Sequence, residues 1–354
     1  MRTIRRLYKN FQGEILAIPG RTIALVFFLI LLILPLITQD SYILRVIIFA
    51  CIFAIYAASW DFLSGFVGQM NLGHAAFFGT AAYAAALLNL KLGLPPWATI
   101  PVGALVAVAA GLVACIPALR LRGIYLALVT LALPIILIGI VFAFPGFTGG
   151  ELGVSGITRL GRYVDSYYIA FVVMGLSVFA MWKLTDVKSG LVRTGVILHA
   201  IREDEIAARV SGINTIRYKM FAFAVSAFFA GIAGGLYVHV MRNAGPSTLE
   251  LLLSFQAIIW TIFGGVATIY GAVTGVFILY PLVEFLYVVP ELRMLIYAIL
   301  IILILLFMPE GIAIWARDKM EERCPRCKLS NVATRQVCRA CGASLHLERT
   351  GSKT

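Results

Sequence analysis

Long apolar runs constrain this chain more than any other feature. A bilayer's hydrocarbon core is crossed by about 17–20 apolar residues, and five unbroken runs approach or exceed that length: 21–38, 43–60, 97–117, 124–144 and 292–308. Only 13% of the residues are charged, against roughly 25% in a typical soluble domain. The buried helices of a soluble protein do not need runs this long or this many. The sequence therefore predicts an integral membrane protein.

The hydropathy pattern predicts an all-α, polytopic transmembrane helix bundle of about ten segments, with a range of eight to ten. The expected segments are 22–38, 43–60, 74–90, 97–117, 124–144, 167–183, 219–240, 254–270, 272–289 and 292–308. Three regions follow from this division: a basic N-terminus at 1–21, a transmembrane domain at 22–310 with a polar loop at 185–218, and a tail at 317–345. The tail has the composition of a soluble segment.

The basic N-terminus followed by an apolar run could belong to a signal peptide. That run ends in Leu34-Pro35-Leu36-Ile37-Thr38-Gln39-Asp40 without a small-x-small cleavage site, and another apolar segment follows at once. We interpret it as a retained first helix.

The net charge of +12 is distributed as the positive-inside rule requires when the N-terminus is cytoplasmic. The N-terminus, the 118–123 loop, the 185–218 loop and the tail then place most Lys and Arg on the cytoplasmic side. We therefore expect a multi-pass protein of the inner (cytoplasmic) membrane with both termini in the cytoplasm and basic residues near lipid headgroups. Nucleic acid is the less favoured partner for this charge.

Small residues recur at four-residue spacing in two of the segments. Ala227, Gly231 and Gly235 form one set, and Gly271 and Gly275 form another. This spacing places small residues on one helical face, where two backbones can approach closely. It favours a compact bundle or a subunit interface, although glycine is also common in membrane helices generally.

A polar, glycine-rich turn interrupts the apolar pattern before residue 75. Gln69, Asn71, Gly73 and His74 lie where a span should begin. Non-helical backbone at membrane depth is tolerated only inside protein or beside a water-filled cavity, and transporters place binding sites at such breaks. These four residues are candidates for the translocation path. The alternative is a helix-capping turn with Asn71 as the cap.

Other ionisable groups are scarce within the spans. Glu284 is the one clear intramembrane carboxylate, and its role is open, whereas proton- or ion-coupled carriers use several such groups. The chain also lacks a Gly-x-x-x-x-Gly-Lys-Ser/Thr loop that would hold ATP. Any ATP hydrolysis must therefore come from another polypeptide.

The polar loop contains a helix-forming stretch with a charged face. The residues of interest are Arg202, Glu203, Glu205, Ala207, Ala208 and Gly212. A short helix with small residues makes a knob that can fit a groove in another protein, and Gly212 can end that helix. The alternative is an ordinary solvated connector.

Three segments resemble the permeases of Liv-type branched-chain amino acid ABC importers, the LivM/LivH-like family. Residues 68–79 (GQMNLGHAAFFG) are similar to a "GQ-x-SLGHAAFFG" segment. Residues 200–208 (AIREDEIAA), followed by 212–214 (GIN), are similar to an "AIRENEIAA…GIN" loop. Residues 219–237 and 263–271 resemble its later "FAG-x-AG-x-LY" and "GG-x-GT-x-x-G" segments. The resemblance covers roughly residues 40–310.

The resemblance implies that Arg202–Gly212 is a coupling helix that docks on a separate ATPase subunit. It also implies a second permease, homologous or identical, and an extracytoplasmic solute-binding protein. Asn71 stands where serine is usual, Asp204 where asparagine is usual, and Ile206 where the broader importer motif has glutamate. The change at Asn71 bears on the identity of the substrate.

Four cysteines form two Cys-x-x-Cys pairs in the tail: Cys324, Cys327, Cys338 and Cys341. Zn²⁺ takes four thiolates in a tetrahedron, and each pair supplies two. Two disulfides are the alternative, but a cytoplasmic tail lies in a reducing compartment. The sequence therefore predicts a zinc-ribbon-like domain. Its role is not evident from the sequence.

We expect a transport subunit without an ATPase site of its own, translocating branched-chain amino acids or similar small polar solutes with ATP used only by its partners. A stand-alone carrier or channel for urea, amides or another small solute is the second hypothesis. A membrane enzyme is the third, because the spans contain no metal or nucleophile constellation.

Overall fold

The computed structural model describes residues 19–38, 40–118, 121, 123–186 and 194–286, and, with gaps, parts of 292–341. It contains two compact units. One holds Gln39–Gly311, and the other joins the described residues up to Thr38 with those from Ile312 onward. The basic N-terminus predicted at 1–21 lies almost entirely outside the described residues. Residues 187–193 of the polar loop and about half of the segment 292–308 also lie outside them.

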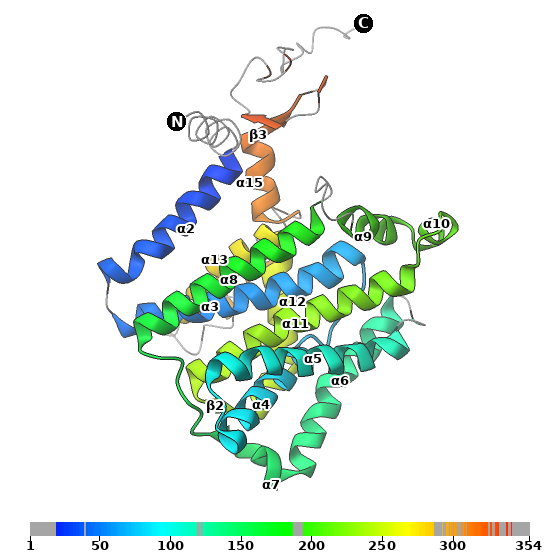
Figure 1. The fold of residues 1–354 in the computed structure, drawn as a ribbon. Helices are drawn as coiled ribbons and strands as arrows, with labels where there is room; N and C mark the ends of the chain where they lie inside the picture. The colour runs from blue at the N-terminus through cyan, green and yellow to red at the C-terminus, as the bar shows by residue number, and fades with distance from the viewer. Residues whose placement is uncertain are drawn as a thin grey trace, which may run out of the picture. The chain divides into compact units, whose positions relative to one another are not determined.

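The main unit is built almost entirely of helices (Figure 1), so the all-α class is confirmed. Its long helices are α3 (Ser41–Trp60), α4 (Ala75–Leu92), α5 (Pro96–Ala118), α6 (Ile124–Ala143), α8 (Tyr163–Thr185) and α11 (Thr215–Met241). Each is long and apolar enough to cross a membrane, α3 together with the π-helix Asp61–Gly65 that continues it. The protein is a multi-pass membrane protein.

The predicted segments 254–270 and 272–289 are one bent pair rather than two ordinary spans. Helix α12 (Leu251–Gly264) has 14 residues and α13 (Ile269–Phe285) has 17, and they meet at 109°. Three glycines allow the contact at the bend. A Cβ on Gly264 would lie 1.8 Å from the Gly271 carbonyl oxygen, and one on Gly275 would lie 2.0 Å from that of Trp260.

Helix α3 lies at the centre of the main unit. Every residue from Ile48 to Trp60 is buried, and the helix packs against α8, α11, α12 and α13. A helix that is apolar all round can be buried in this way. Asp40 caps its start, since Oδ1 accepts from the Tyr42 N–H at 2.8 Å.

The small-residue face predicted on α11 packs against helices of the same chain. A Cβ added to Gly231 would come within 2.7 Å of the Ala104 Cα, and one on Gly235 within 3.2 Å of the Ile100 Cα, both on α5. Gly234 meets the Phe78 carbonyl of α4 in the same way, at 2.2 Å. The spacing thus serves internal packing and makes a rigid trio of α4, α5 and α11.

The loops gather at two ends of the main unit (Figure 1). At one end, α7 (Pro145–Thr148), a 3-10 turn (Gly150–Leu152) and β1 (Val154–Ser155) lie beside β2 (Asn243–Ala244), with Val154 opposite Ala244. The 3-10 turn Pro246–Leu249 leads from β2 into α12. At the other end lie α9 (Thr194–Glu203) and α10 (Glu205–Val210). The connections after α6 and after α11 therefore lie together, away from α9 and α10.

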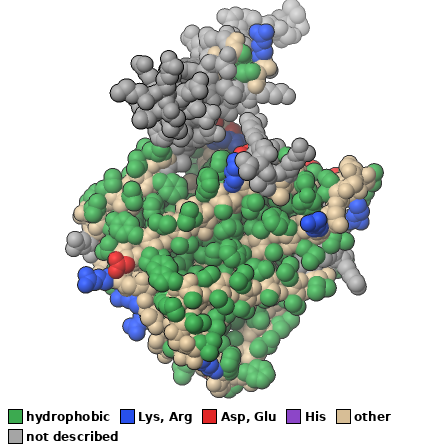
Figure 2. Space-filling view, viewed as in Figure 1, with side chains coloured by type: hydrophobic (Ala, Val, Ile, Leu, Met, Phe, Trp, Pro, Cys, Tyr) green, Lys and Arg blue, Asp and Glu red, His purple; other side chains and the backbone are tan. Residues whose placement is uncertain are grey.

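Hydrophobic side chains cover most of the visible face of the main unit, with Lys and Arg at its margins (Figure 2). Exposed apolar residues on α5, α6 and α8 include Leu105, Val113, Ile136, Leu176 and Phe179. A soluble protein rarely exposes so large an apolar surface, whereas lipid tails would cover it.

The second unit contains α2 (Pro19–Ile37), α15 (Ile312–Met320), and a hairpin of β3 (Glu321–Arg323) with β4 (Ser330–Val332). The two strands are antiparallel, with Glu322 opposite Asn331. Helix α2 coincides with the first predicted segment. Strand β3 ends directly before Cys324, so the first Cys-x-x-Cys pair lies between the two strands of the hairpin.

Candidate functional site

The polar turn predicted from the sequence lies inside the main unit. It connects the π-helix Asp61–Gly65, which ends α3, to the start of α4. Asn71 and His74 are fully buried and Gln69 is 8% exposed, while Met70 is 54% exposed. The polar side chains of this turn therefore point into protein, and its apolar Met70 points outward.

Hydrogen bonds join His74 and Asn71 into one chain. The Ser59 hydroxyl donates to the Tyr56 carbonyl at 2.7 Å and must therefore accept from His74 Nε2, 2.8 Å away. His74 Nδ1 is then free to accept from the Asn71 amide at 3.4 Å. This arrangement fixes a neutral imidazole with its proton on Nε2.

Side chains from three helices, α3, α6 and α12, hold the backbone of the turn and the start of α4. Trp60 Nε1 donates to the Asn71 carbonyl at 2.7 Å, and Thr130 Oγ1 of α6 accepts from the Leu72 N–H at 3.1 Å. Ser254 Oγ of α12 accepts from the Ala75 N–H, which opens α4, at 2.8 Å. Polar groups freed by the broken helix are thus satisfied within the protein, as membrane depth requires.

Gly73 is the tightest point of the turn. A Cβ at this position would lie 1.8 Å from the Thr130 carbonyl oxygen and 3.1 Å from Pro134 Cδ. No side chain fits without moving α6 away from the turn. The glycine of this motif is therefore required by close approach to a neighbouring helix.

Asp61 ties the end of α3 to the bend between α12 and α13. Its carboxylate is fully buried, and Oδ1 accepts from the Ala267 N–H at 2.7 Å. Ala267 has φ of +60°, a left-handed conformation that costs an alanine about 1 kcal/mol or more. The resembling segment of the importer permeases has glycine here.

The segment 194–212, which contains the predicted ATPase contact and is called the coupling segment below, has two helices rather than the single helix Arg202–Gly212 that the resemblance implied. Helix α9 ends at Glu203, and Asp204 caps α10 by accepting from the Ile206 and Ala207 N–H groups at 2.8 and 3.0 Å. Asp204 adopts extended backbone angles, which breaks the helix. Gly212 ends the segment at φ +84° with open space around it, so its conformation requires glycine.

Glu205 anchors α10 to α11. Its Oε2 lies 2.8 Å from Lys219 Nζ, and its Oε1 lies 2.9 Å from Arg209 and accepts from the Thr215 hydroxyl at 3.4 Å. Lys219 is 2% exposed. Sequence reasoning missed this lysine, because nothing in its local pattern distinguishes it from an interfacial cation at the start of a span.

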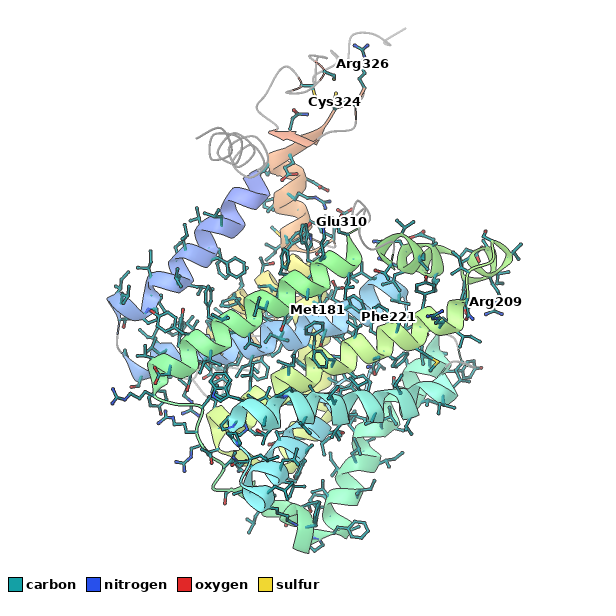
Figure 3. All side chains as sticks on the ribbon, in the orientation of Figure 1. Met181, Arg209, Phe221, Glu310, Cys324 and Arg326 are labelled. Carbon is teal, nitrogen blue, oxygen red and sulfur yellow. The ribbon has the colours of Figure 1, made fainter. Side chains whose placement is uncertain are left out.

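Helix α10 presents an apolar surface to its surroundings. Ile206 is 62% exposed and Val210 is 84% exposed, and four-residue spacing places them on one face. Arg209 extends from the same helix (Figure 3). Of the residues predicted for this knob, Arg202, Glu203 and Ala207 are exposed, but Ala208 is buried. The exposed face therefore contains Ile206 and Val210. Their four-residue spacing is the feature of the sequence that could have predicted this face.

The coupling segment also contacts the residues that precede the polar turn. The Arg202 side chain passes over Gly68, with its Cγ 3.5 Å from where a Cβ would stand, and the His199 ring meets the Phe66 ring edge-on at 5.4 Å. Burial lowers the pKa of His199 below its usual value, and the positive Arg202 lowers it further. The His199 ring is therefore neutral near pH 7.

The four cysteines of the tail converge (Figure 3 labels Cys324). All four Sγ atoms lie within 4.8 Å of one another, with Cys324 3.5 Å from Cys341 and Cys327 3.5 Å from Cys338. Four thiolates around Zn²⁺ at about 2.3 Å would lie about 3.8 Å apart. The backbone N–H of Cys327 lowers the pKa of the Cys324 thiol, which favours the thiolate. The cluster can hold a metal ion.

Glu284 is half-buried near the end of α13. The Tyr42 hydroxyl, at the start of α3, donates to its backbone carbonyl at 3.3 Å. The carboxylate thus belongs to the end of the unit opposite α10, away from the polar turn.

Residues 42–305 match the family described as the permease component of branched-chain amino acid transport systems. The match covers about three quarters of the chain and includes both the polar turn and the coupling segment. The chain belongs to this permease family. Within the family range lie nearly all residues of the main unit, whereas α2, α15 and the four cysteines lie outside it.

Several relatives of this permease are named transport proteins. It is 29% identical over 300 residues to the high-affinity branched-chain amino acid transport system permease protein LivM of Salmonella typhimurium, covering 76% of this chain and 69% of LivM. The LivM of Escherichia coli is 29% identical over 314 residues, covering 80% and 71%. The galactose/methyl galactoside import permease MglC of Salmonella typhimurium is 27% identical over 229 residues, covering 56% and 65%. No solved structure matches the permease at a significant level.

Proposed function

We propose that this chain is the pore-forming permease subunit of an ATP-driven importer for branched-chain amino acids or similar small polar solutes. The observation that carries the proposal is α10, a six-residue helix that holds Ile206 and Val210 out at one end of the bundle. Family membership supplies the transport function, and the LivM relatives supply the class of solute. The exposed apolar face of α10 supports docking on a separate ATPase subunit.

The complete importer would contain two cytoplasmic ATPase subunits, a second permease chain (a homologue or another copy of this one), and an extracytoplasmic solute-binding protein. The chain itself carries out no covalent chemistry, and ATP is used only by its partners. The α9–α10 end faces the cytoplasm in this arrangement, together with both termini. The β1–β2 end faces outward, where the solute-binding protein delivers its cargo.

Transport follows from two conformations of the bundle that ATP binding stabilises to different degrees. Closure of the ATPases displaces α10, and α10 in turn displaces α11 and the residues around Gly68. The polar turn 69–74 then shifts with the start of α4. Gln69, Asn71, Gly73 and His74 border the translocation path in one of the two conformations, in which the hydrogen bonds of the turn are rearranged.

The importer proposal is tested by uptake into proteoliposomes that contain this chain with its ATPases, second permease and solute-binding protein. We expect ATP-dependent uptake of labelled leucine, and none of urea. Vesicles with a hydrolysis-dead ATPase serve as the control. Uptake that proceeds without any ATPase would instead establish a stand-alone carrier or channel.

We further propose that Cys324, Cys327, Cys338 and Cys341 bind one Zn²⁺. The distances between their Sγ atoms suit a tetrahedral thiolate site, and Cys324 and Cys327 lie between the two strands of the β3–β4 hairpin. Zinc supplies no chemistry to transport in this proposal; it fixes the fold of the tail.

Metal analysis of the purified protein tests the zinc site. We expect about one zinc per chain, and its loss in Cys324→Ser and Cys338→Ser, because removing one thiolate leaves an incomplete tetrahedron. Cys51→Ser is the matched control, since Cys51 is buried in α3, and should keep its zinc. A preparation from the wild type without zinc, or with another metal in its place, would contradict the assignment.

A further inference from the structure

Helix α10 is held in place by contacts with its neighbours. It has six residues, whereas isolated helices below about 12–15 residues are marginal in water. Asp204 caps its start and Ala208 packs inward, but only its first residue, Glu205, forms an ion pair with the next span. The side-chain polar contacts between α10 and α11, with Lys219 and Thr215, therefore pass through that residue.

The partner of Glu205 is unusual because it is a buried cation. Lys219 Nζ lies 2.8 Å from Glu205 Oε2, with Lys219 2% and Glu205 15% exposed. A buried ammonium costs several kcal/mol unless it is paired. The second ion pair of Glu205, with Arg209 at 2.9 Å, is different, since Arg209 is 55% exposed and such pairs contribute little. Moving α10 away from α11 would therefore leave Lys219 buried without its counter-charge.

Beyond Lys219, α11 cannot move by itself. Gly231 and Gly235 bring its backbone against α5, and Gly234 brings it against the Phe78 carbonyl of α4. Packed interiors of this kind are stiff and transmit displacement. Helix α4 begins at the polar turn, so a shift of α11 must also move that turn or break the packing.

We propose that the Glu205–Lys219 ion pair is the joint that makes α10 and α11 move as one body, so that Lys219 is a positioning residue for coupling ATP hydrolysis to transport. This inference rests on the proposed function, since it assigns a role inside the importer. Apolar contacts of α10 bind the ATPase, and the buried ion pair passes the movement into the membrane.

The test measures solute transported per ATP hydrolysed in the reconstituted importer. In Lys219→Met we expect assembly with the ATPase and continued ATP hydrolysis, but at least about tenfold less leucine moved per ATP, because a broken buried pair no longer holds α10 to α11. Lys219→Arg keeps the charge and should retain most of the coupling. A smaller amount of assembled protein would lower the rates of leucine transport and ATP hydrolysis together, and would leave the ratio of the two unchanged.

The double variant Glu205→Gln/Lys219→Met is a control for misfolding, because it leaves no buried charge unpaired; Arg209, which loses its partner, is exposed. It should assemble and remain uncoupled. Normal coupling in Lys219→Met or in the double variant would overturn the inference, as would equal impairment by Lys219→Arg. If neither Met variant binds the ATPase, the pair serves assembly and the inference is also wrong. Failure of the wild type to take up leucine with ATP would count against the proposed function instead.

Discussion

Replacing Ile206 and Val210 together by glutamate is expected to abolish ATP-driven uptake. Both side chains are exposed on α10, and their apolar face is the surface that the ATPase would bury. Carboxylates at the centre of such an interface lose apolar contact and are desolvated without a partner, so we expect ATPase binding to weaken at least about thirtyfold. Co-purification of the ATPase and leucine uptake in proteoliposomes measure the effect.

The matched control is Ile206→Leu/Val210→Ile, which keeps the apolar face and should retain both ATPase binding and uptake. The glutamate variant should be produced in normal amounts, because neither side chain is part of the buried core. Undiminished ATPase binding by the glutamate variant would show that α10 is an ordinary solvated connector.

The substitution Gly73→Ala is expected to prevent normal folding of the main unit. The added methyl group would lie 1.8 Å from the Thr130 carbonyl oxygen, and a backbone atom cannot rotate away as a side chain can. We expect a loss of at least about 3 kcal/mol of folding free energy, a large part of the 5–15 kcal/mol typical of a domain. The measurements are the yield of monodisperse protein in detergent and the midpoint of thermal unfolding.

Gly139→Ala provides the comparison, because nothing lies within 4 Å of a Cβ at that position on α6. Alanine there should leave the unfolding midpoint unchanged or raise it slightly, since alanine favours a helix over glycine. A Gly73→Ala protein as stable as Gly139→Ala would mean that α6 can withdraw from the turn without cost. The inference that close packing against α6 requires glycine at position 73 would then be wrong.

Local pattern was enough to predict most of the architecture. Nine of the ten expected segments coincide with described helices, because a run of apolar residues long enough to cross lipid has few alternatives to a helix. The four-residue spacing of Ala227, Gly231 and Gly235 likewise indicated a close helix contact. The two Cys-x-x-Cys pairs indicated the cluster found in the tail.

The candidate sites were predicted less completely. The pattern at residues 202–212 indicated a helix, but the extended backbone of Asp204 divides it in two, and the exposed face includes Ile206 and Val210. The bend between α12 and α13 was missed, because residues 254–289 are apolar throughout and hydropathy does not report a change of direction. The roles of the polar turn and of the coupling segment stay predictions for the experiments above.

Composition and spacing alone determined that this chain is a helical membrane protein, which segments form long apolar helices, and which four cysteines can gather. Those properties depend on residues that are close together in the sequence, because an apolar run forms one helix and a Cys-x-x-Cys turn brings together two thiols three positions apart. Tertiary structure alone decided that Lys219 pairs with Glu205, that His74 is neutral and bonded to Ser59 and Asn71, and that Gly73 faces Thr130. These depend on residues that meet only when helices pack, and no local pattern encodes which helices those will be.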